Sequence, residues 1–447
     1  MNKIKRYSIL IILFFFVGCG GGIITQENTE EQFSSTAPCK PVADDGKQLA
    51  GSCGSLNLGS LFPADIDIPN IDGMRDTAFI TLAEPPYLVP IDLNNLQASL
   101  KFFGLDLGTL PKGSSLDFGV GSFFLSPTQG FLLTGASLVY FNPTSGQILQ
   151  AVSLADVFKL KQPLLLSEAV DTDGDGDQEI SLSGNFSPSF ASDVVVSQNK
   201  VFVSMANLYF TATGTTYRAK GILRLYDLHD SSPYLTIAAT PYLEVSGFNP
   251  TGLLLSKVGD LIITNSGDFK YDEGFKPVPT TPSLLDRLNT TTLTTLTSLN
   301  MGMVGLTFKK IAYAAEDNLG FIGSYMENKC YAIDLNAMTT VRGASNPIYL
   351  GSQQTQLQFI SDMAVRADGE LLAVASFNDN KIFGIDLGDA NYPLLSEVLD
   401  FTETDNPGVT GVGPIAFRPG TPGTDFSGPD LFIIQASPGV LKAVQTY

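Results

Sequence analysis

The chain has 447 residues, a formal charge of −19 at neutral pH, and 43 glycines and 26 prolines. This charge excludes a nucleic-acid partner, because phosphate binding requires a basic surface. The residues are 44% hydrophobic and only 16% charged, which is typical of a turn-rich folded protein and unlike an acidic disordered chain.

The first eighteen residues have the features of a bacterial signal peptide. A positive segment (residues 3–6) precedes an apolar run (residues 9–17) that is too short to span a bilayer as a stable helix. The run ends in Phe16-Val17-Gly18-Cys19, which resembles the lipobox of bacterial lipoproteins, although Phe16 replaces the more usual leucine. The resemblance implies that residues 1–18 are removed and that Cys19 is acylated, with palmitate among its fatty acids.

Acylation of one residue by several chains gives a stable membrane anchor. In lipoproteins, an aspartate directly after the acylated cysteine retains the protein at the inner membrane, and here that place is Gly20. The resemblance therefore implies a cell-envelope lipoprotein held at the outer membrane through its lipid. The alternative is a plain membrane anchor with a coincidental cysteine, which leaves the abrupt end of the apolar run at Gly20 unexplained.

Residues 19–60 contain few apolar residues and many glycine, serine, threonine, glutamine and glutamate residues, so we predict a flexible tether. Cys39 and Cys53 lie within it, and an oxidising compartment favours a disulfide between them, the alternative being two exposed thiols. Cys330 lies in a strand-like run, and we expect it to be a buried free thiol.

From residue 61 to residue 447, short apolar runs broken by turn residues predict an all-β domain. Within it, an apolar run ending in a polar residue recurs at intervals of 50, 85, 59, 48 and 52 residues. The recurring polar residues are Asp92, Asn142, Asp227, Asp286, Asp334 and Asp386. A period of about 50 residues corresponds to one four-stranded blade, so the sequence predicts a β-propeller.

The 85-residue interval predicts an insertion between two blades, at about residues 155–190. A further unit near the C-terminus brings the prediction to seven blades, with six or eight also compatible. The best-formed unit, residues 363–387, contains an Asp-Gly turn between two apolar runs and resembles blades of YVTN-type and SMP-30-like propellers. The rival fold, a two-sheet β-sandwich, does not explain the recurrence.

The predicted insertion contains a dense run of carboxylates with alternating spacing. Oxygen ligands at the first, third, fifth, seventh and ninth places of such a run can surround one Ca²⁺ ion. The run resembles the calcium loops of integrin-type propellers, which implies a structural calcium site, the alternative being an acidic surface turn. The implied ligands are Asp171, Asp173, Asp175, Asp177 and Glu179.

The sequence carries little evidence of catalysis. His229 is the only histidine and lies in a turn, so it cannot supply the ligands of several haems, and no nucleophile motif accompanies it.

We assign no catalytic residue and predict a membrane-tethered scaffold for a protein or glycan partner. The alternative is a calcium-dependent hydrolase similar to SMP-30-like lactonases, with Asp362 and Asn265 as candidate polar residues near the ring centre. A quinone-dependent dehydrogenase is disfavoured because the chain has no tryptophan.

Overall fold

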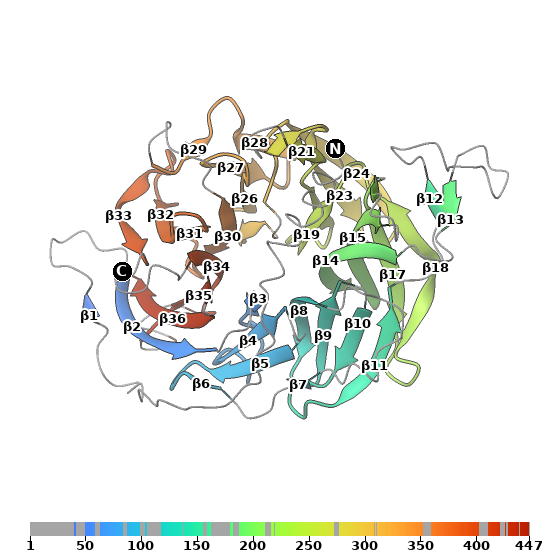
Figure 1. The fold of residues 1–447 in the computed structure, drawn as a ribbon, viewed down its shortest axis with the longest axis horizontal. Helices are drawn as coiled ribbons and strands as arrows, with labels where there is room; N and C mark the ends of the chain where they lie inside the picture. The colour runs from blue at the N-terminus through green and yellow to red at the C-terminus, as the bar shows by residue number, and fades with distance from the viewer. Residues whose placement is uncertain are drawn as a thin grey trace, which may run out of the picture.

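The computed structural model is a ring of antiparallel β-sheets seen face-on in Figure 1. It describes residues 40–41, 50–58, 63–83, 87–98, 103–104, 118–135, 137–154, 159–161, 179–181, 187–210, 216–218, 220–271, 277–307, 309, 311–351, 359–401, 410–420, 425, 428–437 and 439–446. Seven of the sheets are blades arranged around a central axis, which confirms the predicted all-β class and the seven-bladed propeller.

Blades 1 to 3 follow one another from the N-terminal side, and their strands are given in chain order. The innermost strand comes first, β7 pairs with β5 beside β6, and β16 pairs with β15 outside the main strand order β14-β15-β17-β18. Blade 1 contains β3 (Pro63–Asp67), β4 (Thr77–Leu82), β5 (Tyr87–Asp92), β6 (Gln97–Ala98) and β7 (Phe103–Gly104). Blade 2 contains β8 (Gly119–Ser126), β9 (Gln129–Thr134), β10 (Ser137–Phe141) and β11 (Ile148–Ser153). Blade 3 contains β14 (Ser187–Ser197), β15 (Lys200–Phe210), β16 (Thr216–Arg218), β17 (Ile222–Leu228) and β18 (Leu235–Glu244).

Blades 4 to 7 complete the ring in the same order. Blade 4 contains β19 (Pro250–Leu255), β20 (Leu261–Asn265), β23 (Ser283–Asn289) and β24 (Thr294–Gly302). Blade 5 contains β25 (Ala312–Ala314), β26 (Leu319–Gly323), β27 (Lys329–Asp334), β28 (Thr339–Arg342) and β29 (Ile348–Tyr349). Blade 6 contains β30 (Ile360–Val365), β31 (Leu371–Ser376), β32 (Lys381–Asp386) and β33 (Leu394–Asp400). Blade 7 contains β34 (Thr410–Phe417), β35 (Leu431–Ser437) and β36 (Val440–Thr446).

The hydrophobic core lies between neighbouring blades. Between blades 6 and 7, for example, Leu371 and Ala373 of β31 pack against Ile415 of β34 and Ile433 of β35. The middle strands are buried on both faces, as the six buried residues of β31 show. Fully burying one such aliphatic side chain contributes about 1.5–3 kcal/mol, so the repeated apolar runs hold each blade to the next.

The ring is closed by pairing the two ends of the described chain within one blade. The strand β2 (Ala50–Asn57) pairs antiparallel with β36 and forms the outer part of blade 7, where the short strand β1 (Lys40–Pro41) covers it. The predicted boundary of the tether at residue 60 is therefore wrong, because residues 50–57 belong to the propeller. These residues have no long apolar run, and they belong to the sheet because their backbone forms hydrogen bonds with β36.

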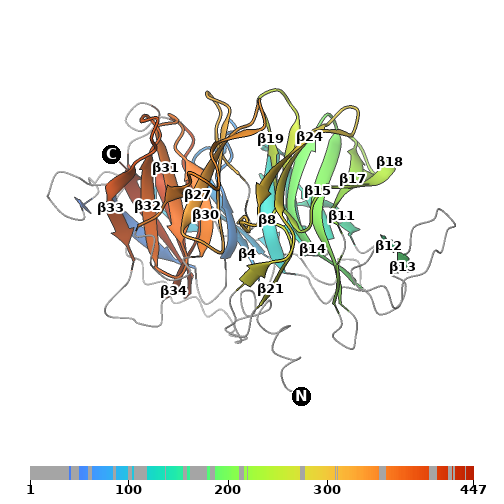
Figure 2. The same ribbon diagram turned by 90° about the horizontal axis from the view of Figure 1, so that it is seen from above.

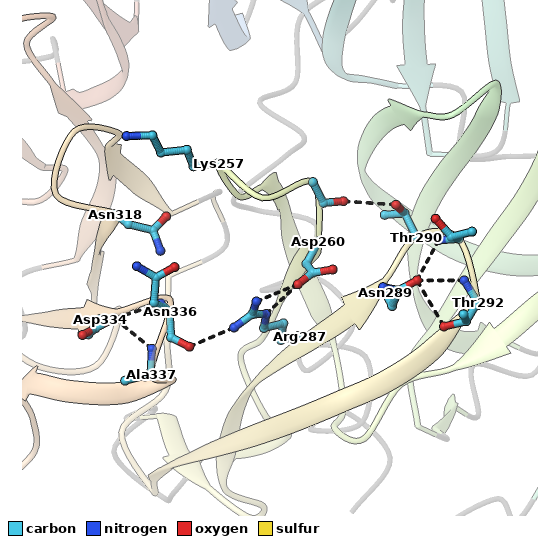
Figure 3. A network of polar contacts seen from close by, with 12 residues as sticks. Lys257, Asp260, Arg287, Asn289, Thr290, Thr292, Asn318, Asp334, Asn336 and Ala337 are labelled. Carbon is cyan, nitrogen blue, oxygen red and sulfur yellow. Dashed lines mark hydrogen bonds and ion pairs between the residues drawn. The ribbon is translucent and has the colours of Figure 1, made fainter.

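Three of the recurring aspartates, Asp92, Asp334 and Asp386, end the third strand of their blade. Asp227 does not, because it lies within β17 and accepts a hydrogen bond from the Lys200 ammonium at 2.6 Å. Asp334 ends β27 and accepts hydrogen bonds from the backbone N–H groups of Asn336 and Ala337 at 2.8 and 2.9 Å (Figure 3). Asp386 ends β32 in the same way and accepts the N–H of Gly388 at 2.9 Å. The predicted equivalence of these two residues is confirmed, and their carboxylates stabilise turns.

Asp286 was assigned to the wrong place in this repeat. It lies in the middle of β23, buried, where its carboxylate accepts hydrogen bonds from Asn265 and from the backbone N–H of Ser246. The turn position of blade 4 belongs instead to Asn289, whose side chain accepts the N–H groups of Thr291 and Thr292 (Figure 3). An amide oxygen can cap this turn as well as a carboxylate can, which is why the periodicity of aspartates alone was misleading.

Two small sheets lie outside the seven blades. The strands β12 (Lys159–Lys161) and β13 (Glu179–Ser181) pair within the predicted insertion between blades 2 and 3. The strands β21 (Phe269–Tyr271) and β22 (Pro277–Pro279) form a hairpin between the second and third strands of blade 4 (Figure 2). Among the described residues there is no helix long and apolar enough to cross a membrane.

Candidate functional site

The innermost strands of the blades line the centre of the ring and share one irregularity. The inner strands of blades 1, 2, 3, 4 and 6 each carry one extra residue at a comparable position of the ladder, which is a β-bulge. The bulged residues are Ala64, Val120, Ser192, Thr251 and Ser361. A bulge turns the side chains of one or two residues away from the regular alternation, so these positions can reach neighbouring blades.

Two of these bulges carry the same Ser-Asp dipeptide and use it in the same way. In blade 3 the Ser192 hydroxyl donates to the carbonyl of Pro250 at 2.6 Å, and the Asp193 carboxylate accepts the N–H of Leu253 at 2.8 Å. Both partners lie on the inner strand of blade 4. Each Ser-Asp pair therefore presents one donor and one acceptor to the backbone of the next blade.

Blade 6 repeats this arrangement toward blade 7. The Ser361 hydroxyl donates to the carbonyl of Val412 at 2.6 Å, and the Asp362 carboxylate accepts the N–H of Ile415 at 3.0 Å. The second oxygen of each carboxylate accepts the N–H of the following residue, Val194 or Met363, at 2.8 Å. Asp193 and Asp362 are thus engaged in joining blades.

Blade 5 contributes a lysine to the centre of the ring. Its innermost strand β25 begins at Ala312, which pairs with Phe321, and before it the N–H of Thr307 donates to the carbonyl of Gly323 at 2.9 Å. Lys309 lies between these two points.

Lys309 forms an ion pair with Asp65 from the opposite side of the ring. Its ammonium lies 3.0 Å from a carboxylate oxygen of Asp65 and donates to the carbonyl of Ala64 at 2.8 Å. Asp65 belongs to blade 1, and blades 6 and 7 separate blade 1 from blade 5. The side chains of Lys309 and Asp65 are only 23% and 11% exposed, so this contact is a well-protected link across the centre of the ring.

Asp362 lies within the electrostatic influence of this ion pair. Burial raises the pKa of its carboxyl to about 6, an effect that the positive charge of Lys309 opposes and the negative charge of Asp65 reinforces. Hydrogen bonds from the N–H groups of Ile415 and Met363 also favour the ionised form. The ring centre therefore holds a buried carboxyl that titrates not far below neutral pH.

The structure does not bring the predicted candidates Asp362 and Asn265 together. Asp362 lies on the inner strand of blade 6, as predicted, whereas Asn265 lies on the second strand of blade 4 and donates to Asp286 at 3.1 Å. In the part of the chain that the structure describes, no group of three or more histidine, cysteine, aspartate or glutamate side chains is arranged to hold a metal ion. A metal-dependent site at the ring centre gains no support from these residues.

Sequence reasoning missed both Lys309 and the Ser-Asp pairs. The pairs carry a signal, because Phe190-Ala-Ser-Asp-Val and Phe359-Ile-Ser-Asp-Met share the same phrase at the start of their blades. Comparing the beginnings of the blades, rather than their third strands, would have found it. Lys309 carries no comparable signal, since its role depends on a residue 244 positions away.

Most predicted site residues of the N-terminal part and of the insertion lie outside the described residues. This applies to Cys19, Cys39, Asp171, Asp173, Asp175 and Asp177. Glu179 begins β13, and Cys53 lies in β2, where the preceding Ser52 pairs with Lys40. Acylation, the disulfide and calcium binding therefore stay predictions.

Two other predicted residues are found where they were expected. Cys330 is a buried free thiol in β27, and its burial raises the pKa of the thiol strongly. His229 is exposed in the turn after β17, with its Nε2 atom 2.8 Å from the Thr236 hydroxyl. Neither residue is placed at the channel.

This geometry defines the chain as a seven-bladed β-propeller with inner-strand polar residues that link its blades. No family model matches the chain, and no curated protein matches it in sequence.

Solved structures of low sequence identity are nevertheless similar to it. The β-propeller domain of Cps50 (Swd1) from Myceliophteria thermophila has a TM-score of 0.51 and 9% identity, covering 89% of this chain and 100% of that one. Hsv2 of Kluyveromyces lactis has a TM-score of 0.46 and 11% identity, covering 84% and 90%. At 9% identity the likeness to the Cps50 domain shows the fold alone.

Proposed function

We propose that this protein is a lipid-anchored lipoprotein of the cell envelope whose β-propeller is a rigid scaffold for a protein or glycan partner. The lipobox-like sequence ending at Cys19 supports the anchor. The ring supports the scaffold, because a propeller presents many loops on a stiff frame.

One observation carries the preference for a scaffold over a hydrolase. The inner-strand carboxylates that could have formed a reaction centre are already used, Asp193 and Asp362 by backbone N–H groups and Asp65 by Lys309. A general acid, base or metal ligand must be available to substrate, whereas these groups hold neighbouring or opposite blades together. The polar residues of the channel thus serve the stability of the ring.

The lipid anchor predicts a labelling result. Cells that express the wild-type chain and receive labelled palmitate should incorporate the label into this protein, and the Cys19→Ser variant should remain unlabelled and leave the membrane fraction. Cys330→Ser serves as the matched control, because its buried thiol is not available for acylation. Label retained in Cys19→Ser would contradict the anchor.

The scaffold role predicts discrete cross-links in intact cells. A photo-cross-linking amino acid placed at exposed Val258 or Met303, or at exposed Thr128 on blade 2, should capture a partner from at least one of these surfaces. The same positions in the Cys19→Ser background should lose the adducts, because the protein is then displaced from its partner. Complete absence of adducts at all three positions would count against a scaffold.

A further inference from the structure

Strongly exposed large apolar side chains are confined to one part of the propeller. Among the residues that the structure describes, they all lie in blades 3, 4 and 5 or directly after blade 4. These side chains are Ile237, Tyr242, Val258, Val278, Leu296, Met303 and Val341. Single exposed apolar residues need no explanation, but such a one-sided distribution centred on blade 4 indicates an interaction surface.

The outer strand of blade 4, β24, is unusual within this surface. Its sequence from Thr294 to Gly302 contains no charged residue and no proline. The first five residues are all exposed, including Leu296 at 52%, so neither face of this part of the strand is covered. Its hydroxyl-rich, β-branched composition suits a strand that pairs on both sides, although among the described strands β23 alone pairs with it.

Each of the other outer edges is protected in a recognisable way. Blade 1 ends in strands of two residues, and blade 5 ends in β28, which has four residues. Blade 3 has Pro241 in its outer strand, and blade 6 has Glu397 and Asp400.

In blade 7, β1 covers the N-terminal part of β2. In blade 2, the side chain of Gln150 donates to the carbonyl of Leu235 in blade 3 and accepts its N–H, both at 2.9 Å. Proteins commonly use such devices to prevent unwanted strand pairing. In β24 there is no charge, no proline and no covering strand among the described residues, and its contact toward blade 3 is a single bond between the hydroxyls of Ser298 and Ser246 at 3.0 Å.

We propose that β24 is the docking edge for an extended, uncharged segment of a partner polypeptide, which adds a strand to blade 4. This proposal rests on the scaffold function above and names its surface. The backbone groups of the edge would supply hydrogen bonds, while Leu296 and the threonine side chains of β24 would contact alternate residues of the added strand.

The negative charge of the chain indicates which kind of polypeptide binds to β24. A second copy of this chain would bring another charge of −19 toward the first, which opposes self-association. The partner segment is therefore a different polypeptide, neutral where it pairs with β24 and flanked by lysine or arginine residues that the acidic body attracts.

A designed peptide tests this docking edge. The probe is a fluorescein-labelled peptide of sequence KKTVTVTVKK with blocked ends, and its binding to the purified full-length protein is measured by fluorescence anisotropy. The matched control peptide has the same sequence with alternate backbone amides methylated, so that one of its edges cannot donate hydrogen bonds. We expect saturable binding of the probe and at least about tenfold weaker binding of the methylated peptide.

Protein variants locate the binding to β24. Leu296→Lys and Thr295→Lys place a charge on the exposed edge and should each weaken binding at least about tenfold, whereas Gln147→Lys on blade 2 should not change it.

Equal binding by all variants, or no binding up to about 1 mM peptide, would overturn strand addition. A concentration-dependent dimer that Leu296→Lys abolishes would instead assign the edge to a second copy and also overturn the proposal. Cross-links from Val258 or Met303 without peptide binding would leave the scaffold function standing.

Discussion

Replacing Lys309 with methionine is expected to lower the free energy of unfolding by about 3 kcal/mol. The substitution keeps most of the side-chain volume but removes the charge that compensates Asp65 across the channel. The side chain of Asp65, which is only 11% exposed, would then lie without a neighbouring cation. Asp362 would also lose the positive charge that favours its ionised form. Urea titrations at neutral pH measure the difference.

Two further variants distinguish the effect of breaking the ion pair from the effect of removing any lysine. Lys257→Met removes a lysine from an exposed turn and should change stability little. In a double-mutant cycle, Asp65→Asn combined with Lys309→Met should cost clearly less than the sum of the two single changes, because the uncompensated carboxylate is gone. Additive effects, or a cost for Lys309→Met no greater than that for Lys257→Met, would show that the contact does not brace the ring.

Acidification is expected to stabilise the wild-type protein relative to the Asp362→Asn variant. Burial raises the pKa of Asp362 to about 6, whereas its ordinary value is 3.8. Between these values the folded state binds a proton that the unfolded state releases, so this contribution is fully present below pH 4 and is lost as the pH rises through 6. The expected gain over neutral pH is about 1 kcal/mol at pH 5 and about 2 kcal/mol at pH 4.

Urea titrations of both proteins at several pH values between 4 and 7.5 isolate this group, because titrations common to both cancel in the difference. Asp368→Asn provides a control of opposite sign. Partial burial raises the pKa of Asp368, but hydrogen bonds from Arg366 and from backbone N–H groups outweigh it, and the net pKa is lowered. A difference between wild type and Asp362→Asn that does not vary with pH would contradict the shifted titration.

The sequence was sufficient to predict the propeller because its blades repeat a local pattern. In blades 1, 2, 5 and 6 the third strand is an apolar run that leads into a polar turn residue, and both features depend on neighbours in the chain, as Asp334 and Asp386 illustrate. The assignment of Asp286 failed for the same reason, since a buried aspartate in a strand and a turn aspartate look alike when only spacing is considered.

The polar contacts of the channel could be predicted only in part. The Ser-Asp phrase recurs and was open to detection, but its bonds depend on how close the next blade lies. Lys309 meets Asp65 only because seven blades complete a ring that sets the two inner strands opposite each other. Closure also explains the misplaced end of the tether, since β2 has no strong strand pattern and is ordered by pairing with β36.

That closure has a consequence for the order in which the molecule can form. Ala50 is synthesised early, yet its partner Thr446 emerges after the other six blades are complete. Bringing together segments so distant in the chain carries a large loop-closure entropy and is slow compared with forming hairpins within one blade. The apolar faces of the first and last blades would therefore stay open to solvent until the final strand arrives, which makes this seam the stage at which a chaperone would have most to protect.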